Sequence, residues 1–481
     1  MKHDLRVALI NPIKVISYPP LNLAFLAGYL LKYCKIKVDL RIFDINFTNR
    51  LSRDILDFDP QIAGVTTLSP FVLNALQINR ELKEANPTLL TICGGVHATV
   101  APEELVANGF DIAVIGEGEQ TLLKIVESYI EHHGNLDAGV LSKIDGIAFK
   151  DNQEIRRTAD AEVIEDLDTI PHPPRHLLNQ GYSKSFYITR GASSRNLYTV
   201  HGARGCPFHC VFCCVNFVVK AKVRRHSPEY IIEEMNLLVR DQHAQWIFFT
   251  DDTFFVDKNH TRRLCERIIE SGLHKKVCWE VQIRSNLIKD GDMELLQLMK
   301  RANCKQVAIG FETFNQRMLT YIKGPGITVE DHHRAIRLLN QAGLHVLGTF
   351  IVGTPTETIA EMEENISFIK KYSEEGKLQY FQVGRMQAYP GTKVYEIAEE
   401  NGMFSKKYLD SLRTEGQENS SQSLNDIIPK AVQDNALKDL TLVAFRRIPP
   451  KEKLLWVLNN VVFSPAKVLD GAIWMIKQLK Q

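Results

Sequence analysis

Three cysteines stand close together near the middle of the chain, within Gly205-Cys-Pro-Phe-His-Cys-Val-Phe-Cys-Cys214. Cys206, Cys210 and Cys213 follow the spacing Cys-x3-Cys-x2-Cys. Three thiolates on one loop can hold three irons of a cubane [4Fe–4S] cluster. No fourth cysteine falls at a standard spacing, so the fourth iron would stay open, as a catalytic metal requires. A zinc site with His209 as fourth ligand is the alternative, although His209 adjoins Cys210 and neighbouring residues share one small metal poorly.

The other cysteines and the ends of the chain indicate a cellular compartment. Four of the nine cysteines fall within nine residues, whereas a disulfide scaffold would spread them and would normally occupy a shorter secreted chain. Cys214 is expected to be a bystander, and the remaining five cysteines to be small core residues. The charged N-terminus has no apolar signal core, and no apolar run reaches about 18 residues. We therefore expect a cytoplasmic protein.

Strands and helices alternate in the half of the chain that contains the cysteines. The expected strands cover 196–201, 246–250, 279–284, 306–311, 345–352 and 380–388, and the helices between them include 228–240, 259–271 and 330–342. About six strand–helix units are too few for a complete eight-unit barrel. The sequence predicts a partial, open barrel over 196–410, with the cysteines directly after its first strand.

A second parallel sheet, with helices on both faces, is predicted for residues 1–150. The expected elements are strands 5–12, 40–45, 89–93 and 112–115 and helices 21–33 and 70–85. Ligands bind such doubly wound α/β sheets beyond the carboxyl ends of the strands. The loops expected there are Asn11-Pro12, Thr66-Thr67, Gly94-Gly95-Val96-His97 and Gly116-Glu117-Gly118-Glu119. Their glycines would let a ligand approach the backbone, although helix starts in any doubly wound domain also need glycine.

Two further segments complete the 481 residues, a length that suggests two to four domains. Residues 151–195 carry an acidic stretch and a proline-rich stretch, which is typical of a linker. Residues 411–481 predict a helical C-terminal region, in which 451–463 and 466–480 form two amphipathic helices. These helices either cap the barrel or lie on a membrane surface, and the latter would fit a lipid substrate. The formal net charge of +1 gives no argument for nucleic acid.

The cysteine segment resembles the signature of the radical S-adenosylmethionine (SAM) superfamily, which follows the first strand of a partial barrel. In that family the open iron chelates the amino and carboxylate groups of SAM. One electron from the cluster then cleaves SAM to methionine and a 5′-deoxyadenosyl radical, which abstracts hydrogen from an unactivated C–H bond. The resemblance covers roughly residues 5–400.

The resemblance implies SAM contacts along the first three barrel strands. Phe212 matches an aromatic residue that packs near the adenine. Asp251 and Asp252 end the second strand, where the family binds the SAM amino group, and carboxylates suit an ammonium. Gln282 and Arg284 end the third strand, and a guanidinium suits the SAM carboxylate. A helix cap at the aspartates and a surface salt bridge at Arg284 are the structural alternatives.

Three later motifs continue the same order along the chain. Glu312, within Gly310-Phe-Glu-Thr313, is expected near the ribose or the sulfonium of SAM. Gly353, within 348–357, belongs to a fifth-strand glycine–proline motif, and 389–392 resembles the sixth-strand turn. The last two motifs also suit simple turns.

The N-terminal domain resembles the cobalamin-binding domain that precedes the barrel in one large radical SAM subfamily. The resemblance rests on 19–28, 94–98 and 116–119. The cobalamin contacts that it implies are Asn11, Thr66, Thr67, Gly94, Gly95, His97, Gly116, Glu117 and Gly118. The Asp-x-His-x-x-Gly ligand motif of many cobalamin domains is missing from residues 1–150, as is common in this subfamily. A structural role is the alternative for His97.

The subfamily resemblance implies C-methylation that uses SAM twice. One SAM methylates cob(I)alamin, and a second yields the 5′-deoxyadenosyl radical, which abstracts hydrogen from the substrate. The resulting carbon radical then takes the methyl group from methylcobalamin. The alternatives are a radical cyclisation of the magnesium-protoporphyrin cyclase type and a non-catalytic cobalamin sensor. The substrate is expected to be a small molecule or a lipid, the electron donor a flavodoxin or ferredoxin, and no nucleic-acid partner is expected. No residue is assigned to chemistry on the substrate.

Overall fold

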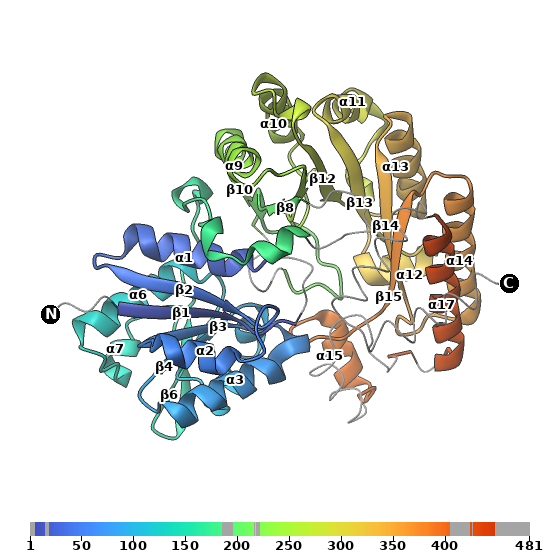
Figure 1. Ribbon diagram of the computed structural model, residues 1–481. Coiled ribbons are helices and arrows are strands. Elements are labelled where there is room, and N and C mark those ends of the chain that lie inside the picture. Colours follow the sequence, from blue (N-terminus) through green and yellow to red (C-terminus); the bar gives the residue numbers. More distant parts are fainter. Residues whose placement is uncertain are drawn as a thin grey trace.

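A computed structural model describes residues 5–14, 19–184, 196–215, 217, 222–404, 424–425 and 427–447. Over these residues the chain forms two α/β units, each built around its own main sheet. The N-terminal unit is blue to cyan in Figure 1, and the C-terminal unit is green to red. The predicted fold class is confirmed.

The N-terminal sheet has seven strands in the order β2-β1-β3-β4-β5-β6-β7. Their bounds are β1 Leu5–Asn11, β2 Val38–Asp44, β3 Ile62–Thr66, β4 Leu90–Gly94, β5 Ile112–Val114, β6 Ile147–Asp151 and β7 Glu154–Arg157. The strands from β2 to β5 pair in parallel, whereas β6 and β7 add an antiparallel edge that extends beyond residue 150. The strand order reverses between β1 and β3, where doubly wound sheets bind ligands.

Helices cover both faces of this sheet because its strands are apolar on both sides. The helices are α1 Leu21–Tyr33, α2 Leu51–Phe58, α3 Val72–Ala85, α4 Val96–Val100, α5 Pro102–Ala107, α6 Glu119–Glu131 and α7 Ala138–Leu141. In β1, Val7 and Leu9 pack in the core with α1 and α6, while Ala8 and Ile10 pack with α2 and α3. This alternation follows from the two-residue period of a strand.

The C-terminal unit contains the partial barrel that the sequence predicts. Its six strands run in the order β15-β14-β13-β12-β11-β8, and every neighbouring pair is parallel. Their bounds are β8 Leu197–Val200, β11 Trp246–Phe249, β12 Cys278–Ile283, β13 Cys304–Glu312, β14 His345–Val352 and β15 Tyr380–Arg385. A small antiparallel ribbon joins β9 Ala203–Arg204 to β10 Arg224–Arg225.

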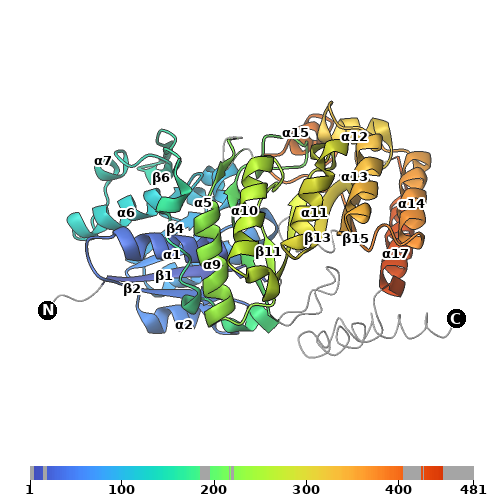
Figure 2. The same cartoon turned by 90° about the horizontal axis from the view of Figure 1, so that it is seen from above.

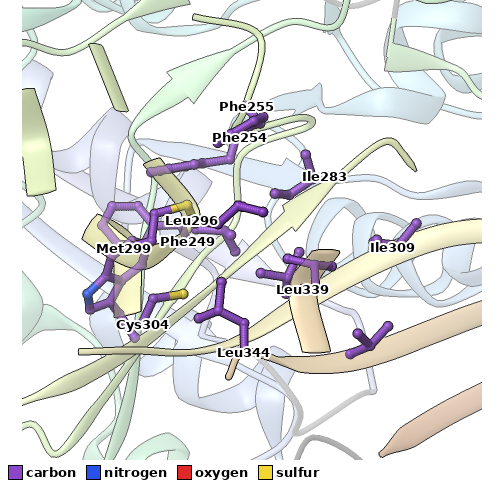
Figure 3. Packing of buried hydrophobic residues seen from close by; sticks show 14 of the residues in the cluster. Phe249, Phe254, Phe255, Ile283, Leu296, Met299, Cys304, Ile309, Leu339 and Leu344 are labelled. Atoms are coloured by element: carbon purple, nitrogen blue, oxygen red, sulfur yellow. The ribbon is translucent and has the colours of Figure 1, made fainter. Parts of the chain in front are cut away.

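Helices follow the barrel strands and pack on their outer side (Figure 2). They are α9 Pro228–Asp241, α10 Lys258–Glu270, α11 Met293–Arg301, α12 Gln316–Lys323, α13 Val329–Gln341, α14 Ile359–Glu374, α15 Lys393–Glu400 and α17 Lys430–Arg447. Thr328 and Thr358 start α13 and α14 with capping boxes. Figure 3 shows Phe249 and Ile309 from strands packed with Leu296 from α11. The other side of the strands carries polar residues together with a small apolar cluster of Leu197, Trp246 and Phe248.

The predicted linker and C-terminal region are described in part. Arg175 donates to the Thr199 carbonyl at 2.6 Å and pairs with Glu234, so the linker packs against β8 and α9. At the other end, α17 packs beside β15 and α14. Residues 451–480, where membrane contact is predicted, lie outside the described residues. Within the described part, no helix is long and apolar enough to cross a membrane.

Candidate active site

The three cysteines lie on a loop that follows β9, and main-chain bonds to the barrel hold this cysteine loop. The N–H of Cys213 donates to the Cys210 carbonyl at 3.0 Å. The N–H of Val211 donates to the Ile322 carbonyl at 2.9 Å, and the N–H of Val394 donates to the Val211 carbonyl at 2.9 Å. The end of α12 and the start of α15 therefore fix the middle of the loop.

Arg284 brings a buried guanidinium to the cysteine loop. Its Nη1 donates to Cys210 Sγ at 3.1 Å, and its Nη2 donates to the Lys323 carbonyl at 3.0 Å. The guanidinium also stacks over Phe208, 4.3 Å from the ring centroid. Its Nε is buried and has no hydrogen-bond partner among the described residues. Arg284 is thus no surface ion pair, and its remaining donor could bind a carboxylate beside the cluster.

The three thiols are compatible with a cubane cluster. All three are free. Burial raises the pKa of the Cys206 thiol and raises that of Cys213 to about 12, so bound metal is needed to hold them as thiolates. Over the described ranges, no group of three or more metal-ligating side chains is arranged to hold one ion. Each thiolate of a cubane binds a different iron, so such convergence is not required.

Asp251 and Asp252 hold the backbone that leads into the cysteine loop. Asp251 Oδ1 accepts from the Gly202 N–H at 2.6 Å, and Asp252 Oδ2 accepts from the Gly205 N–H at 2.9 Å. Burial raises the pKa of Asp251 to about 7 and also raises that of Asp252. The helix-cap alternative does not apply, because Asp257 caps α10.

Glu312 forms a buried ion pair at the end of β13. Its carboxylate lies 3.3 Å from Lys323 Nζ, which also donates to the Gly310 carbonyl. The backbone of Glu312 has φ +65°, an unfavourable conformation for a non-glycine residue that often marks functional sites. Gln282 is exposed on β12, two residues after the buried Glu280 and on the same side of the sheet. Sequence analysis did not single out Lys323, which lies a full helix away from Glu312 in the chain.

Gly353 and Phe212 both contact neighbouring protein groups that explain their positions. The Gly353 N–H donates to Glu357 Oε2 at 2.7 Å, and its φ of +72° suits glycine. Burial raises the pKa of the Glu357 carboxyl to about 7. Phe212 packs against an apolar cluster that includes Ile322 and Met386. The turn alternative therefore accounts for the position of Gly353, while Phe212 anchors the cysteine loop.

A cavity of about 480 Å³ lies between the strand ends of the two units. Six predicted cobalamin contacts line it, namely Thr66, Gly94, Gly95, Gly116, Glu117 and Gly118. Apolar side chains from β1, β3, β4, β5, α1 and α6 and from the loops after the strands form most of the remaining wall on the N-terminal side. A cavity with apolar walls and a few polar groups is typical of a small-molecule site.

The other three predicted cobalamin contacts are buried beside the cavity and bonded to protein groups. Asn11 Nδ2 donates to an Asp44 carboxylate oxygen at 3.1 Å, and His97 Nδ1 lies 2.9 Å from Ser69 Oγ. Thr67 Oγ1 donates to a carbonyl of β4 at 2.9 Å. The structural alternative therefore accounts for His97. These residues support the walls, whereas the glycines leave room for a cofactor.

The barrel contributes His201, Thr250 and Asp252 to the same cavity. His201 Nδ1 lies 3.1 Å from Thr250 Oγ1, and burial lowers the pKa of His201 to about 3, so the ring is neutral. Sequence analysis missed His201, although its place directly after the first barrel strand was a usable signal. Asp252 connects the two sites, because it lines the cavity and also bonds to the backbone before Cys206.

Comparisons with known proteins assign family models to both units. A Radical SAM superfamily model matches residues 200–369, and a B12 binding domain model matches residues 16–126. An uncharacterized methyltransferase of Pyrococcus horikoshii is 32% identical over 80% of this chain and 79% of the relative. An anaerobic magnesium-protoporphyrin IX monomethyl ester cyclase of Cereibacter sphaeroides is 29% identical over 72% of this chain and 56% of the cyclase.

Two solved structures share the fold across both units. TsrM, a radical SAM methyltransferase of Kitasatospora setae with cobalamin and a [4Fe–4S] cluster bound, has a TM-score of 0.65 and 20% identity. The match covers 83% of this chain and 75% of TsrM. OxsB, a cobalamin-dependent SAM radical enzyme with aqua-cobalamin and SAM bound, has a TM-score of 0.65 and 18% identity. That match covers 92% of this chain and 62% of OxsB.

Proposed function

Since the chain belongs to the radical SAM superfamily and carries an N-terminal B12-binding domain, we propose that it methylates an unactivated carbon of its substrate. Its cofactors are a [4Fe–4S] cluster, SAM and cobalamin. The observation that carries the proposal is the shared cavity, whose wall combines the glycine loops of the N-terminal unit with His201, Thr250 and Asp252. Cobalamin, when bound, supplies the methyl group.

The chain's own residues hold and orient the cofactors in this proposal. Cys206, Cys210 and Cys213 hold the cluster. Arg284 directs its unpaired Nε–H to the SAM carboxylate, and Asp252 offers a carboxylate to the SAM amino group. The apolar walls of the cavity exclude water, which would otherwise quench a radical.

Glu312, Phe212 and Gln282 complete the proposed SAM site. Glu312 is held by Lys323 at the end of β13 and is assigned to the ribose or sulfonium. Phe212 is assigned to the adenine, and the exposed amide of Gln282 remains available on the inner side of the barrel. Gly353 shapes the turn after β14.

A radical cyclisation is the second candidate, favoured by the similarity to the magnesium-protoporphyrin cyclase. Products distinguish the two reactions. Methyl transfer produces S-adenosylhomocysteine together with 5′-deoxyadenosine, whereas a cyclase should form little of the former. A non-catalytic sensor would form neither product after reduction.

The proposed function implies a substrate class, an electron donor and a cellular location. We assign the substrate to small molecules or lipids, electron delivery to a flavodoxin or ferredoxin, and the protein to the cytoplasm. The free cysteines support the last assignment. Peripheral membrane contact through 451–480 remains a prediction, and a nucleic-acid partner is not expected.

The first experiment measures iron, sulfide and cobalamin in protein purified anaerobically from cobalamin-fed cells. We expect about four irons and one cobalamin per chain, with only the iron lost in the Cys206/Cys210/Cys213→Ala variant. Iron without cobalamin, even after reconstitution, would move the assignment to the cyclisation. A chain without cysteine-dependent iron would contradict radical chemistry altogether.

A further inference from the structure

Two arginines of the barrel unit meet two glutamates of the N-terminal unit. Arg204 and Arg224 face each other across the β9–β10 ribbon, while Glu117 lies in the loop between β5 and α6 and Glu119 is the first residue of α6. We call these four residues the interdomain ion network. Arg224 Nη1 donates to Glu117 Oε2 at 2.9 Å, and its Nη2 bonds to the other carboxylate oxygen. Arg204 Nη2 donates to Glu119 Oε1 at 2.6 Å, and its Nη1 lies 3.5 Å from Glu117.

The network is buried and balanced in charge. The side chains of Glu117 and Arg224 are 7% and 2% exposed, and those of Glu119 and Arg204 are 6% and 11% exposed. Burial opposes ionisation of Glu119, yet Arg204 outweighs it, and the pKa of Glu119 is lowered. Burial likewise opposes the charge of Arg204, yet the glutamates raise its pKa. Buried ion pairs add little net stability, but their geometry is restrictive.

The network lies directly between the two cofactor sites. Glu117 and Glu119 flank Gly118 in the loop that lines the cavity, and Arg204 stands two residues before Cys206. Arg224 also donates to the Ile164 carbonyl at 2.5 Å, which ties the linker to the same point. A shift of the cavity loop relative to the cysteine loop must therefore break one of these bonds.

We propose that the interdomain ion network is a set of positioning residues that fixes the cobalamin side of the cavity relative to the cluster. The inference rests on the proposed function. Methyl transfer from SAM to cobalt crosses the two units. The S–CH3 bond would break with its electron pair left on sulfur, and bound cobalamin in its cobalt(I) state would supply the electron pair that accepts the methyl group, so that S-adenosylhomocysteine would be released. Reductive cleavage of SAM uses one electron and takes place within the barrel alone.

The two reactions should respond differently to a loosened network. A misplacement of about 1 Å can slow a positioned reaction by about 100-fold. Methyl transfer from SAM to cobalamin depends on the relative position of the two units, whereas cleavage of SAM to 5′-deoxyadenosine depends only on the barrel. Without the unidentified substrate, methyl transfer should stop after one methyl group per cobalamin, and the 5′-deoxyadenosyl radical should take its hydrogen atom from a thiol such as dithiothreitol added to the assay.

The test compares both products in the full chain, reconstituted with cluster and cobalamin and reduced with titanium(III) citrate in the presence of SAM. In Arg224→Met we expect S-adenosylhomocysteine to form about 10- to 100-fold more slowly, with 5′-deoxyadenosine within about twofold of wild type. Arg224→Lys keeps the positive charge but cannot form the two parallel hydrogen bonds to Glu117. Its rate of S-adenosylhomocysteine formation should therefore lie between those of wild type and Arg224→Met. The matched control is Glu165→Gln, which removes an ion pair with Lys222. The side chains of Glu165 and Lys222 are 62% and 59% exposed, so this variant should change the rate of neither product.

A second measurement does not depend on turnover. Hydrogen exchange of the cobalamin-free protein should be faster at the amides of 116–119 and 203–205 in Arg224→Met than in the control. If Arg224→Met fails to fold, Glu117→Met/Arg224→Met replaces the pair by apolar side chains, which buried sites tolerate. A folded variant that transfers methyl at the wild-type rate, or exchanges like wild type, overturns the inference. Wild-type protein that forms no S-adenosylhomocysteine contradicts the proposed function, while the exchange comparison still tests the network.

Discussion

Two side chains around the cysteine loop hold its backbone or thiols and also belong to the proposed SAM site. Arg284 bonds to Cys210 and still has a donor, and Asp252 bonds to the Gly205 N–H while it lines the cavity. Substitution of such residues changes the loop and the cofactor site at once. Conservative cysteine variants therefore give the cleaner test of the cluster.

Cys213→Ser should lose the cluster, while Cys214→Ser should keep it. Both thiols are partly buried neighbours on the same loop, so the pair controls for local packing. We expect iron to fall from about four per chain to near zero in Cys213→Ser only. Colorimetric iron and sulfide assays on anaerobically purified protein measure this. Equal loss in both variants would place Cys214 among the ligands.

Glu357 should make stability depend on pH. Its pKa of about 7 exceeds the ordinary value of about 4.3, so the neutral carboxyl is favoured in the folded chain. The stability that it contributes is complete below about pH 4 and is lost as the pH rises through about 7, at about 1.4 kcal/mol per pH unit. Urea unfolding at about pH 5 and about pH 8 should show a larger loss in wild type than in Glu357→Gln. Equal losses would refute this assignment.

Sequence patterns predicted the cluster residues but not the buried ion pairs of the barrel. The cysteine spacing lies within one short segment, so no knowledge of the fold was needed. The pairing of Glu312 with Lys323 depends on how α12 returns to the end of β13, which spacing cannot predict. His97 lies in a predicted ligand loop, yet its side chain turns inward to Ser69.

At the scale of elements, the turn after β15 contacts the N-terminal unit through a glycine. A Cβ on Gly391 would collide with Val100 Cγ1, and the glycine has φ +83°. The predicted sixth-strand turn is therefore also a contact between the two units. The contact leaves no space for a side chain at Gly391.

Gly391→Ala should destabilise the chain by about 1–3 kcal/mol through overpacking. Val100→Ala removes the closest atom, so the double variant should recover part of this loss, although the backbone strain at Gly391 remains. Denaturant unfolding of the two single variants and the double variant measures the coupling. Strictly additive losses would mean that the two residues do not meet as described.

Most strands of the two parallel sheets were predictable, but β3 and the short antiparallel edge were missed. The predicted strand 345–352 matches β14 from end to end, because its length and apolar content leave no competing interpretation. β3, Ile62–Thr66, was missed although it is apolar and buried throughout. β6 and β7 were also missed. β7, Glu154–Arg157, is almost entirely charged and forms a strand only because β6 offers an edge to pair with. Pairing between strands is a tertiary effect that local patterns do not record.

At the scale of the whole molecule, both main sheets direct strand ends to one cavity. The sequence predicted two such sheets and the ligand side of each, but not that they share one site. That arrangement depends on the buried charges between the units, which look like ordinary surface residues in a sequence.

The C-terminal residues provide a test of membrane contact. The amphipathic pattern of 451–480 predicts that the full chain sediments with liposomes while a form that ends at Pro450 stays in the supernatant. Anionic vesicles should bind more strongly than neutral ones, because lysines accompany both helices. If full-length protein and the shortened form both stay in the supernatant, the membrane interpretation and the lipid substrate lose their support.

The main-chain hydrogen bonds from Val211 to α12 and α15 bear on the stability of the protein after exposure to oxygen. They involve no iron, so we expect them to remain after oxygen destroys the cluster. A damaged chain should then keep its loop in shape and escape the proteases that remove unfolded proteins. Oxygen would switch the enzyme off without discarding it, and the cell's iron–sulfur assembly machinery could refit a cluster once oxygen is gone. The cell would then recover activity by rebuilding the cluster rather than by synthesising a new chain.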